Sequence, residues 1–238
     1  MHNSINTLSI RFRPDGFSLS FTDDQNNIIT SRFVECKPFE LSASALNDIL
    51  QSQAEIDNTA SPLKVICEIR PYIFIPDDLF MPEHANTYLE FAGEKKTENN
   101  RTLYNQLNIW KTNNVFVLPE SLYQAIMQFA GNIPVQHHLT ELIRAYALET
   151  VTSDTLFIYC NNDHIDVIVI KDRKPVLINS FKASTPEDIA YYALLFMQET
   201  GMNADTCKIN VLNNSNVENI SSVLKKHTTD CIEISIKN

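Results

Sequence analysis

Two short turns carry residue types that could bind a phosphate group. The first is Asp15-Gly16-Phe17-Ser18, and the second is Asn161-Asn162-Asp163-His164. Small residues let backbone N–H groups approach a phosphate, hydroxyl groups donate hydrogen bonds to it, and an aspartate orients magnesium or water. By this chemistry Asp15, Ser18 and Asp163 are the candidate ligand-binding residues of the chain.

Both turns depart from a working phosphate clamp. In the first turn Pro14 removes one N–H donor, and the bulky Phe17 follows the glycine directly. The second turn has no glycine, and only 4 glycines occur in the whole chain, so neither a P-loop nor a G-x-G-x-x-G turn can be assembled. Residues of these types also dominate ordinary hairpin turns. We therefore favour structural turns over phosphate binding.

Other chemistries find less support. A metal-dependent nuclease needs converging carboxylates, but the first strand contains none, and we expect Glu68 and Asp166, which lie in strand patterns, to face solvent. His137 and His138, placed on one helix, would point about 100° apart and could not easily share a metal ion. His138 and Glu141 would share a face, as solvated helix residues often do. The sequence thus names no catalytic residue and no metal site, and we favour a chain without enzyme activity.

Composition narrows the partners and the compartment. The formal charge of −10 arises from 29 acidic and 19 basic side chains among 238 residues, and no basic patch gathers locally, which disfavours direct nucleic-acid binding. The 5 cysteines show no C-x-x-C spacing. The first residues lack a secretory signal, and no window is apolar over a membrane-spanning length. We expect a cytoplasmic protein that does not insert into a membrane.

One order of elements runs twice through the chain. Each copy has a strand hairpin, a third strand, an amphipathic helix and a further strand, as judged from alternating and 3.6-residue apolar periods. The first copy comprises strands Leu8–Phe12, Phe17–Phe21 and Ile28–Cys36, a helix capped by Ser42 or Ser44, a loop over Ser52–Pro62 and a strand over Lys64–Arg70. The second comprises strands from Phe157 and Ile165, a helix from Thr185 to Gly201 and a strand over Lys208–Leu212. This predicts two lobes, residues 1–135 and 136–238.

The segment between the copies is the least regular. Residues 71–111 read as an insertion, in which Leu103–Trp110 and Val115–Leu118 predict a hairpin. Helices are predicted over Pro119–Ala130 and His137–Glu149, and near the end of the chain Asn216 can cap a last helix before a strand over Cys231–Ile236. The insertion is also rich in aromatic and apolar side chains: Phe74, Phe80, Met81, Tyr88 and Phe91. They either form a partner surface or anchor the insertion to its own lobe, and we favour anchoring.

The segments Leu8–Phe12, Asp15–Ser18, Phe157–Ile170 and Asn179–Phe181, followed by the Thr185 helix, resemble an uncharacterised Bacteroides-type family with an actin-like ATPase fold. The layout is more distantly similar to the pilus assembly protein PilM and to the cytoplasmic part of the secretion protein GspL. The resemblance implies an α/β, duplicated ribonuclease-H-like (actin-like ATPase) fold with two lobes, each a mixed sheet with flanking helices. It also implies a scaffold or adaptor role. The glycine motif with which actin-like ATPases bind adenosine is missing from Lys208–Asn216.

Two functions remain. The first is a degenerate actin-like domain, without cofactor, that acts as a non-catalytic scaffold or adaptor through contacts with another protein. The alternative is a nucleotide-binding protein or slow ATPase with atypical phosphate loops, in which Asp15, Ser18 and Asp163 would hold ATP with magnesium. The partner, the pathway and the oligomeric state do not follow from the sequence.

Overall fold

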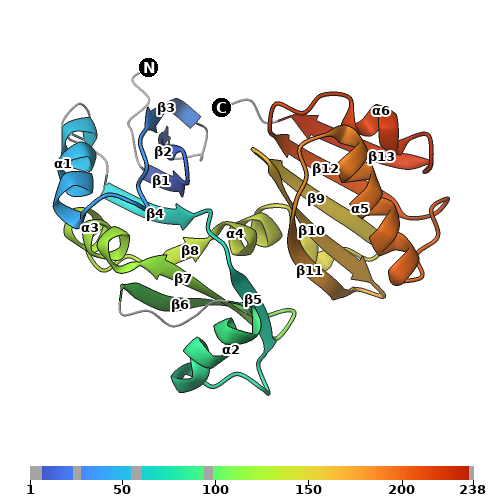
Figure 1. Ribbon diagram of the computed structural model, residues 1–238, viewed down its shortest axis with the longest axis horizontal. Coiled ribbons are helices and arrows are strands. Elements are labelled where there is room, and N and C mark those ends of the chain that lie inside the picture. Colours follow the sequence, from blue (N-terminus) through green and yellow to red (C-terminus); the bar gives the residue numbers. More distant parts are fainter. Residues whose placement is uncertain (1–6, 24–27, 55–60, 94–98, 236–238) are drawn as a thin grey trace. The chain divides into compact units, whose positions relative to one another are not determined.

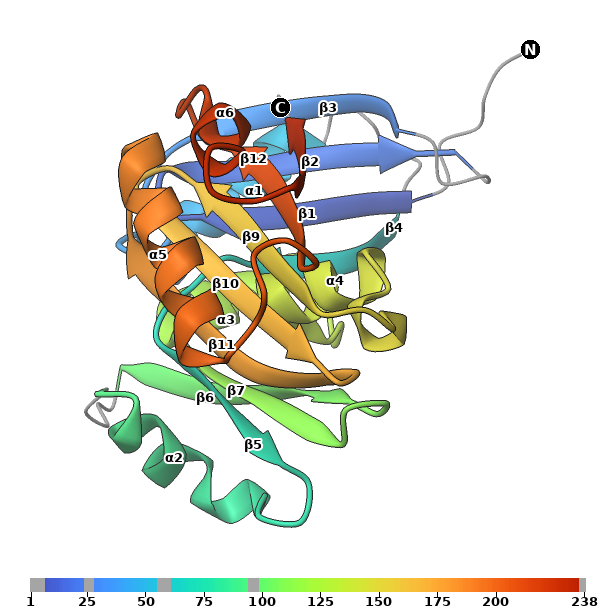
Figure 2. The ribbon, with the colours of Figure 1, turned by 90° about the vertical axis from the view of Figure 1, so that its right-hand side faces the viewer.

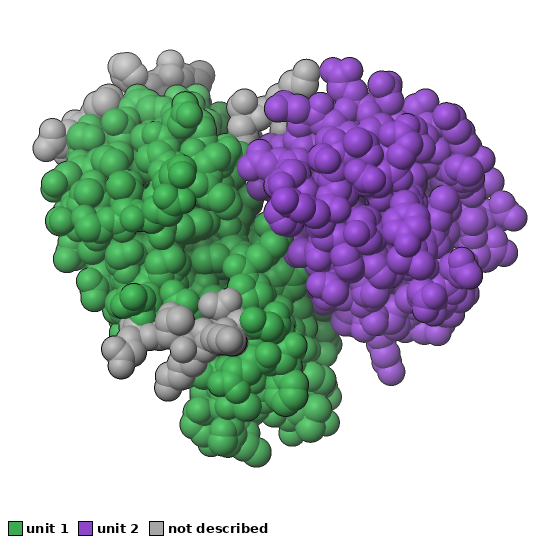
Figure 3. All heavy atoms as spheres, in the orientation of Figure 1, with its two compact units in different colours: residues 1–142 green, residues 143–238 purple. Residues whose placement is uncertain are grey.

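A computed structural model of the chain describes residues 7–23, 28–54, 61–93 and 99–235. The chain divides into two compact units, residues 1–142 and 143–238 (Figure 3). Each unit is built around a five-stranded mixed sheet, and the first unit also contains a three-stranded sheet (Figure 1).

The five-stranded sheet of the first unit has the order β3-β2-β1-β4-β8. Its strands are β1 (Thr7–Arg13), β2 (Gly16–Thr22), β3 (Ile28–Glu35), β4 (Ser61–Cys67) and β8 (Val135–His137). The β1–β2 and β2–β3 pairs are antiparallel, whereas β1–β4 and β4–β8 are parallel. Alternate residues of β1 and β2 form the core together with helices α1 (Ala43–Ala54) and α3 (Glu120–Ala130). As predicted, α1 is capped by Ser42, whose Oγ accepts a hydrogen bond from the Ala45 N–H at 3.3 Å.

The insertion is more regular than its sequence indicates. Strands β5 (Tyr72–Pro76), β6 (Asn100–Leu107) and β7 (Thr112–Pro119) form an antiparallel sheet in the order β5-β7-β6. The predicted hairpin is present as β6–β7, although Thr112–Asn114 belong to the strand and not to the turn. Helix α2 (Ala85–Phe91), which follows a 3-10 turn at Pro82–His84, packs on this sheet and was not predicted.

The second unit repeats the topology of the first. Its sheet has the order β11-β10-β9-β12-β13, with two antiparallel pairs followed by two parallel pairs. The strands are β9 (Thr155–Asn161), β10 (His164–Lys171), β11 (Lys174–Lys182), β12 (Lys208–Asn214) and β13 (Asp230–Ser235). The hairpin, the third strand and the two parallel strands therefore occupy the same positions in both sheets. The duplication inferred from the sequence is confirmed.

Helix α5 (Pro186–Glu199) covers one face of this second sheet (Figure 2). Its start is confirmed, because the Thr185 Oγ accepts a hydrogen bond from the Asp188 N–H at 3.1 Å and Pro186 occupies the first turn. Ile189, Ala193 and Met197 recur at helical spacing and join a core with alternate residues of β10. The helix is thus positioned by its own apolar stripe, which packs against the apolar face formed by alternate residues of the strand.

Several predicted boundaries are wrong. Strand β4 ends at Cys67, α1 continues to Ala54, and the short strand β8 was missed, so the helix expected from His137 is α4 (His138–Ala145), followed by a 3-10 turn at Leu148–Thr150. The last helix, α6 (Ile220–Leu224), has Asn219 and not Asn216 at its N-cap position, without a side-chain cap. Between the second and third strands the sequence also predicts a turn at Asp23–Asn27, and residues 24–27 of it lie outside the described residues. None of the described helices is long and apolar enough to cross a membrane.

Candidate functional site

The first candidate turn is a tight two-residue loop between β1 and β2. Arg13 pairs with Gly16, so only Pro14 and Asp15 form the loop, and Pro14 has no N–H. One carboxylate oxygen of Asp15 lies 3.5 Å from Arg13 Nε, and the carbonyl oxygen of Asp15 accepts a hydrogen bond from the Cys36 N–H at 3.3 Å. The side chain of Asp15 is therefore engaged with its own hairpin.

Gly16 is required by the neighbouring strand. A Cβ atom at this position would lie 2.3 Å from the carbonyl oxygen of Val34 and 2.5 Å from Cζ of Phe33. Ser18 lies inside β2, opposite Arg11 on one side and Phe33 on the other, and is buried. Of the two binding residues predicted on this hairpin, Asp15 is therefore in the loop and Ser18 is within the sheet.

In the second candidate turn, between β9 and β10, the carboxylate of Asp163 contacts two basic side chains. Asn162 adopts a positive φ of 51°, and Asp163 is half-exposed. The Asp163 carboxylate lies 2.8 Å from His164 Nδ1 and 3.6 Å from Lys182 Nζ. The hydrogen bond to His164 is the main cause that holds the pKa of Asp163 below its usual value. Asp163 belongs to the second unit, whereas Asp15 and Ser18 belong to the first.

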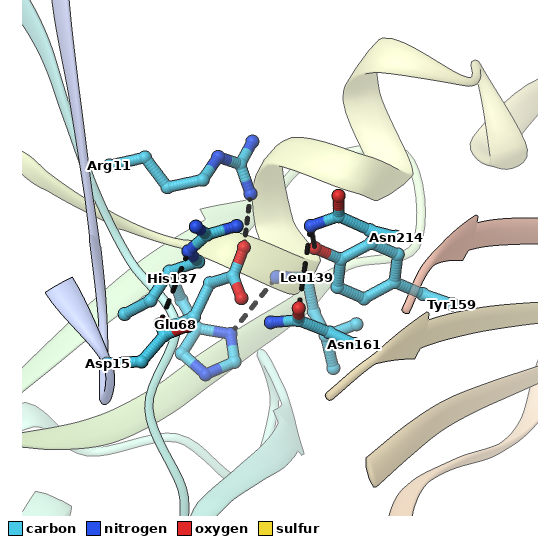
Figure 4. A network of polar contacts seen from close by, with 9 residues as sticks. Arg11, Asp15, Glu68, His137, Leu139, Tyr159, Asn161 and Asn214 are labelled. Atoms are coloured by element: carbon cyan, nitrogen blue, oxygen red, sulfur yellow. Dashed lines mark hydrogen bonds and ion pairs between the residues drawn. The ribbon is translucent and has the colours of Figure 1, made fainter. Parts of the chain in front are cut away.

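Glu68 and Asp166 were expected to face solvent, and this expectation is wrong. Glu68 is 1% exposed and bonds to Arg11 Nη1 at 2.8 Å, while its N–H donates to the carbonyl oxygen of Phe12 at 2.9 Å (Figure 4). Asp166 is 0% exposed and accepts a hydrogen bond from the Ser180 hydroxyl. Buried carboxylates persist where such partners compensate for lost hydration. Glu68 lies in the first unit and Asp166 in the second, and each bonds to a side chain of a strand in its own sheet.

His137 lies in β8 and caps the next helix. Its main-chain N–H donates to Asn105 Oδ1 at 2.6 Å, and its ring Nε2 lies 3.0 Å from the carbonyl oxygen of Ile69. Nδ1 accepts a hydrogen bond from the Leu139 N–H at 3.3 Å, which occupies an N–H at the start of α4 (Figure 4). These contacts assign the proton to Nε2 and give the ring a structural role. Within the described residues no group of three His, Cys, Asp or Glu side chains could hold a metal ion.

In the second unit a polar pocket of about 560 Å³ opens between the end of β12, the start of α6 and β13. Asn213 Nδ2 donates to the carbonyl oxygen of Val217 at 2.8 Å and to Glu233 Oε1 at 3.0 Å. The Ser221 N–H donates to the other oxygen of Glu233 at 2.9 Å. Burial opposes ionisation of Glu233, but the hydrogen bonds from Ser221 and Asn213 outweigh it and lower the pKa. The walls of this pocket also include Ser215, Asn216, Glu218, Asn219, Ser222 and Ser235.

The next residue, Asn214, points its amide toward two neighbouring side chains of β9. Its Nδ2 lies 3.4 Å from the Tyr159 hydroxyl and 3.4 Å from Asn161 Oδ1 (Figure 4). The stretch Asn213–Ser215 therefore carries polar groups on both sides of the sheet. In the sequence this stretch was notable for its missing glycine motif. The adjacent asparagines Asn213 and Asn214 in a strand pattern were the signal that predicts polar groups on both sides of the sheet.

Two aromatic residues of the insertion pack within it, as we favoured. The Phe80 ring lies 4.8 Å from that of Tyr104, and the Tyr88 hydroxyl donates to the carbonyl oxygen of Leu79 at 2.8 Å. The same hydroxyl accepts a hydrogen bond from the Met81 N–H at 3.0 Å. Phe91, by contrast, is 82% exposed. Phe80 and Tyr88 thus anchor the loop to its own sheet.

The family of the chain follows from its match to a family model. The model for "Protein of unknown function (DUF3822)" matches residues 2–229. The chain belongs to this family. No curated protein matches the chain.

Solved structures that resemble this DUF3822 member share its fold. A Bacteroides thetaiotaomicron protein with an actin-like ATPase fold and unknown function is 22% identical, with a TM-score of 0.79 over 96% of this chain and 90% of that chain. PilM in a PilM–PilN type IV pilus biogenesis complex is 12% identical, with a TM-score of 0.55 over 97% and 88%. The ethanolamine utilization protein EutJ from Carboxydothermus hydrogenoformans is 8% identical, with a TM-score of 0.53 over 96% and 84%. The chain therefore has the actin-like ATPase fold.

Proposed function

We propose that this protein is a degenerate actin-like domain that acts as a non-catalytic scaffold or adaptor through contacts with another protein. The observation that carries the proposal is that the carboxylates of both candidate phosphate turns already contact basic side chains of the chain itself. Asp15 faces Arg13 across a loop that contains a proline, and Asp163 faces His164 and Lys182. A phosphate at either turn would have to compete with these contacts.

Two further features support this proposal. PilM, which this chain resembles in fold, is found in a complex with PilN, so this fold is compatible with a role that depends on protein contacts. All 5 cysteines are free thiols, which fits the cytoplasmic location that the composition suggested.

Calorimetric titration with ATP and magnesium tests the proposal. We expect no binding heat for the unmodified protein at millimolar nucleotide, and none for Asp15→Ala. The exposed Asp78→Ala serves as a matched control, because Asp78 lies outside both turns. Saturable binding that Asp15→Ala removes and Asp78→Ala preserves would contradict the scaffold proposal.

The alternative function, nucleotide binding with atypical loops, is favoured by one observation. The polar pocket beside Asn213 lies in the stretch where the resemblance to actin-like ATPases places the adenosine-binding motif. Ser222→Trp tests this alternative, since Ser222 is exposed at the wall of the pocket and an indole there would fill it. ATP binding that Ser222→Trp abolishes would establish the alternative, whether or not Asp15→Ala has an effect.

A further inference from the structure

Strand β3 is an edge strand of the five-stranded sheet in the first unit. It ends the order β3-β2-β1-β4-β8, and no other described strand pairs with it (Figure 2). Half of the main-chain N–H and C=O groups of an edge strand point away from the sheet and can pair with another strand. Three of the other edges carry features that block such pairing: β8 has 3 residues, β5 ends in a proline, and β11 contains Lys174, Pro175 and Lys182. The edge strands β6 and β13 contain neither lysine nor proline, and β6 also has 8 residues. β3 has 8 residues and contains neither lysine nor proline.

An apolar side chain is held in place in the middle of this edge. Phe33 is 42% exposed, and the guanidinium of Arg13 lies 4.5 Å from the centre of its ring. The absence of a side chain at Gly16 leaves room for the same ring. One side of the Phe33 ring is therefore held by Arg13 and the space above Gly16, while the other side faces solvent. Its burial by a partner would cost little side-chain conformational entropy, because the ring is already ordered.

We propose that β3 binds β3 of a second copy of this chain, as an antiparallel pair around a two-fold axis at Phe33. In this register Phe33 faces Phe33 of the second copy, and Ser31 faces Glu35 on both sides of the axis. Directly opposite aromatic residues stabilise a strand pair, and a serine hydroxyl can donate to a carboxylate. The exposed residues of one edge thus complement those of the other, as a two-fold interface requires.

Neighbouring registers are less favourable. An axis at Arg32 would place two guanidinium groups opposite each other, and an axis at Val34 would place Phe33 against Glu35. An axis at Ser31 would set Phe33 opposite Ile29, but Ile29 lies where the pairing of β3 with β2 shifts by one residue, so the strand is irregular at that point. The residues Thr30–Glu35 pair regularly with β2, and the axis at Phe33 lies within them.

Edge strand β13 provides a comparison within the same chain. Ile232 is 55% exposed and Ile234 is 50% exposed. A two-fold axis that sets these two isoleucines opposite each other also sets Glu233 against Glu233 of the second copy. Like charges directly opposite each other destabilise a strand pair. Exposed apolar residues alone therefore do not make β13 equivalent to β3.

Sedimentation velocity between roughly 2 and 200 µM tests the proposal. A single strand edge is a small interface, so we expect a reversible dimer with a dissociation constant on the order of 10 µM. Phe33→Lys and Phe33→Glu, each measured alone, should weaken the dimer at least tenfold because like charges would meet on the axis. Phe91→Lys is the matched control, since Phe91 is 82% exposed and lies on α2, and it should change the affinity by less than twofold.

An equimolar mixture of Phe33→Lys and Phe33→Glu gives the decisive result. If the axis lies at Phe33, the two variants should form a one-to-one dimer with at least wild-type affinity, because a lysine then faces a glutamate. Circular dichroism and the melting temperature of each variant confirm that it is folded. A wild-type protein that stays monomeric at 200 µM, or a mixture that stays monomeric, would overturn the proposal. The ATP titration is independent of this outcome.

Discussion

Replacing Gly16 by alanine should destabilise the first unit through a clash with β3. The added Cβ would lie 2.3 Å from the Val34 carbonyl oxygen, about 1 Å closer than even a short C···O contact. It would also lie 2.5 Å from Cζ of Phe33. The Phe33 ring can rotate away, but the Val34 oxygen belongs to the main chain of a paired strand. Relief of the clash therefore requires β3 to move away from β2.

The expected magnitude follows from the cost of overpacking. Forcing extra atoms into a packed site costs typically about 1–3 kcal/mol, and we expect the upper half of this range because a main-chain atom must move. For chains of this size 1 kcal/mol lowers the melting temperature by about 2–4 °C, so a loss of about 2–3 kcal/mol in Gly16→Ala should lower it by roughly 4–12 °C. Thermal unfolding followed by circular dichroism measures this shift.

Two control variants separate the causes. Gly93→Ala, in the same unit, has no atom within 4 Å of the new Cβ and carries only the cost of a positive φ of 88°, so its shift should be smaller. Phe33→Ala in the Gly16→Ala background should recover little stability, since the Val34 oxygen remains. A shift for Gly16→Ala no larger than that for Gly93→Ala would refute the packing argument. It would also reopen a phosphate role for this glycine.

Two further predictions concern titratable groups. Glu233→Gln should lower the free energy of unfolding by about 1 kcal/mol at neutral pH, because it weakens the charge-assisted hydrogen bonds from Ser221 and Asn213. Folding lowers the pKa of Glu233, so this contribution is present above about pH 4.3 and is lost as the pH falls through the folded-state pKa. Urea titrations of the two proteins should therefore converge in acid. Unequal stabilities at low pH would contradict this. Burial raises the pKa of the Cys160 thiol to about 12 and that of the Cys231 thiol to about 11. At pH 8 a disulfide reagent should therefore modify at most Cys36 in the native protein, but all 5 thiols in guanidinium. Rapid modification of a second thiol in the native protein would count against this burial.

The elements that were predicted correctly are those with strong local signals. The β1–β2 hairpin follows from alternation around Pro14–Gly16, and α5 follows from Thr185 and Pro186 before a helical apolar stripe. The missed strand β8 has only 3 residues and forms by pairing with β4, which is distant in sequence. Such a short strand carries almost no periodicity of its own, so no local pattern could identify it.

The candidate site shows the same division. The residues Pro14–Gly16 and Asn161–His164 predicted two turns, and both turns are present, whereas Ser18 lies within β2. The burial of Glu68 depends on the pairing of β1 with β4, which places its N–H on Phe12 and its carboxylate on Arg11. The apparent irregularity of the insertion likewise disappears once β5 pairs with β7, because main-chain hydrogen bonds between strands compensate for a polar sequence.

By itself the sequence determined the duplicated order of elements, apart from β5, β8 and α2, because periodicity and backbone preference act over a few neighbouring residues. Tertiary structure alone decided that Gly16 serves the packing of Phe33 and Val34, that Glu68 and Asp166 are buried, and that β3 is an edge strand among the described residues. Each of these depends on which strand lies beside which. Strand pairing joins residues far apart in the chain, and its energy resides in contacts that no local window contains.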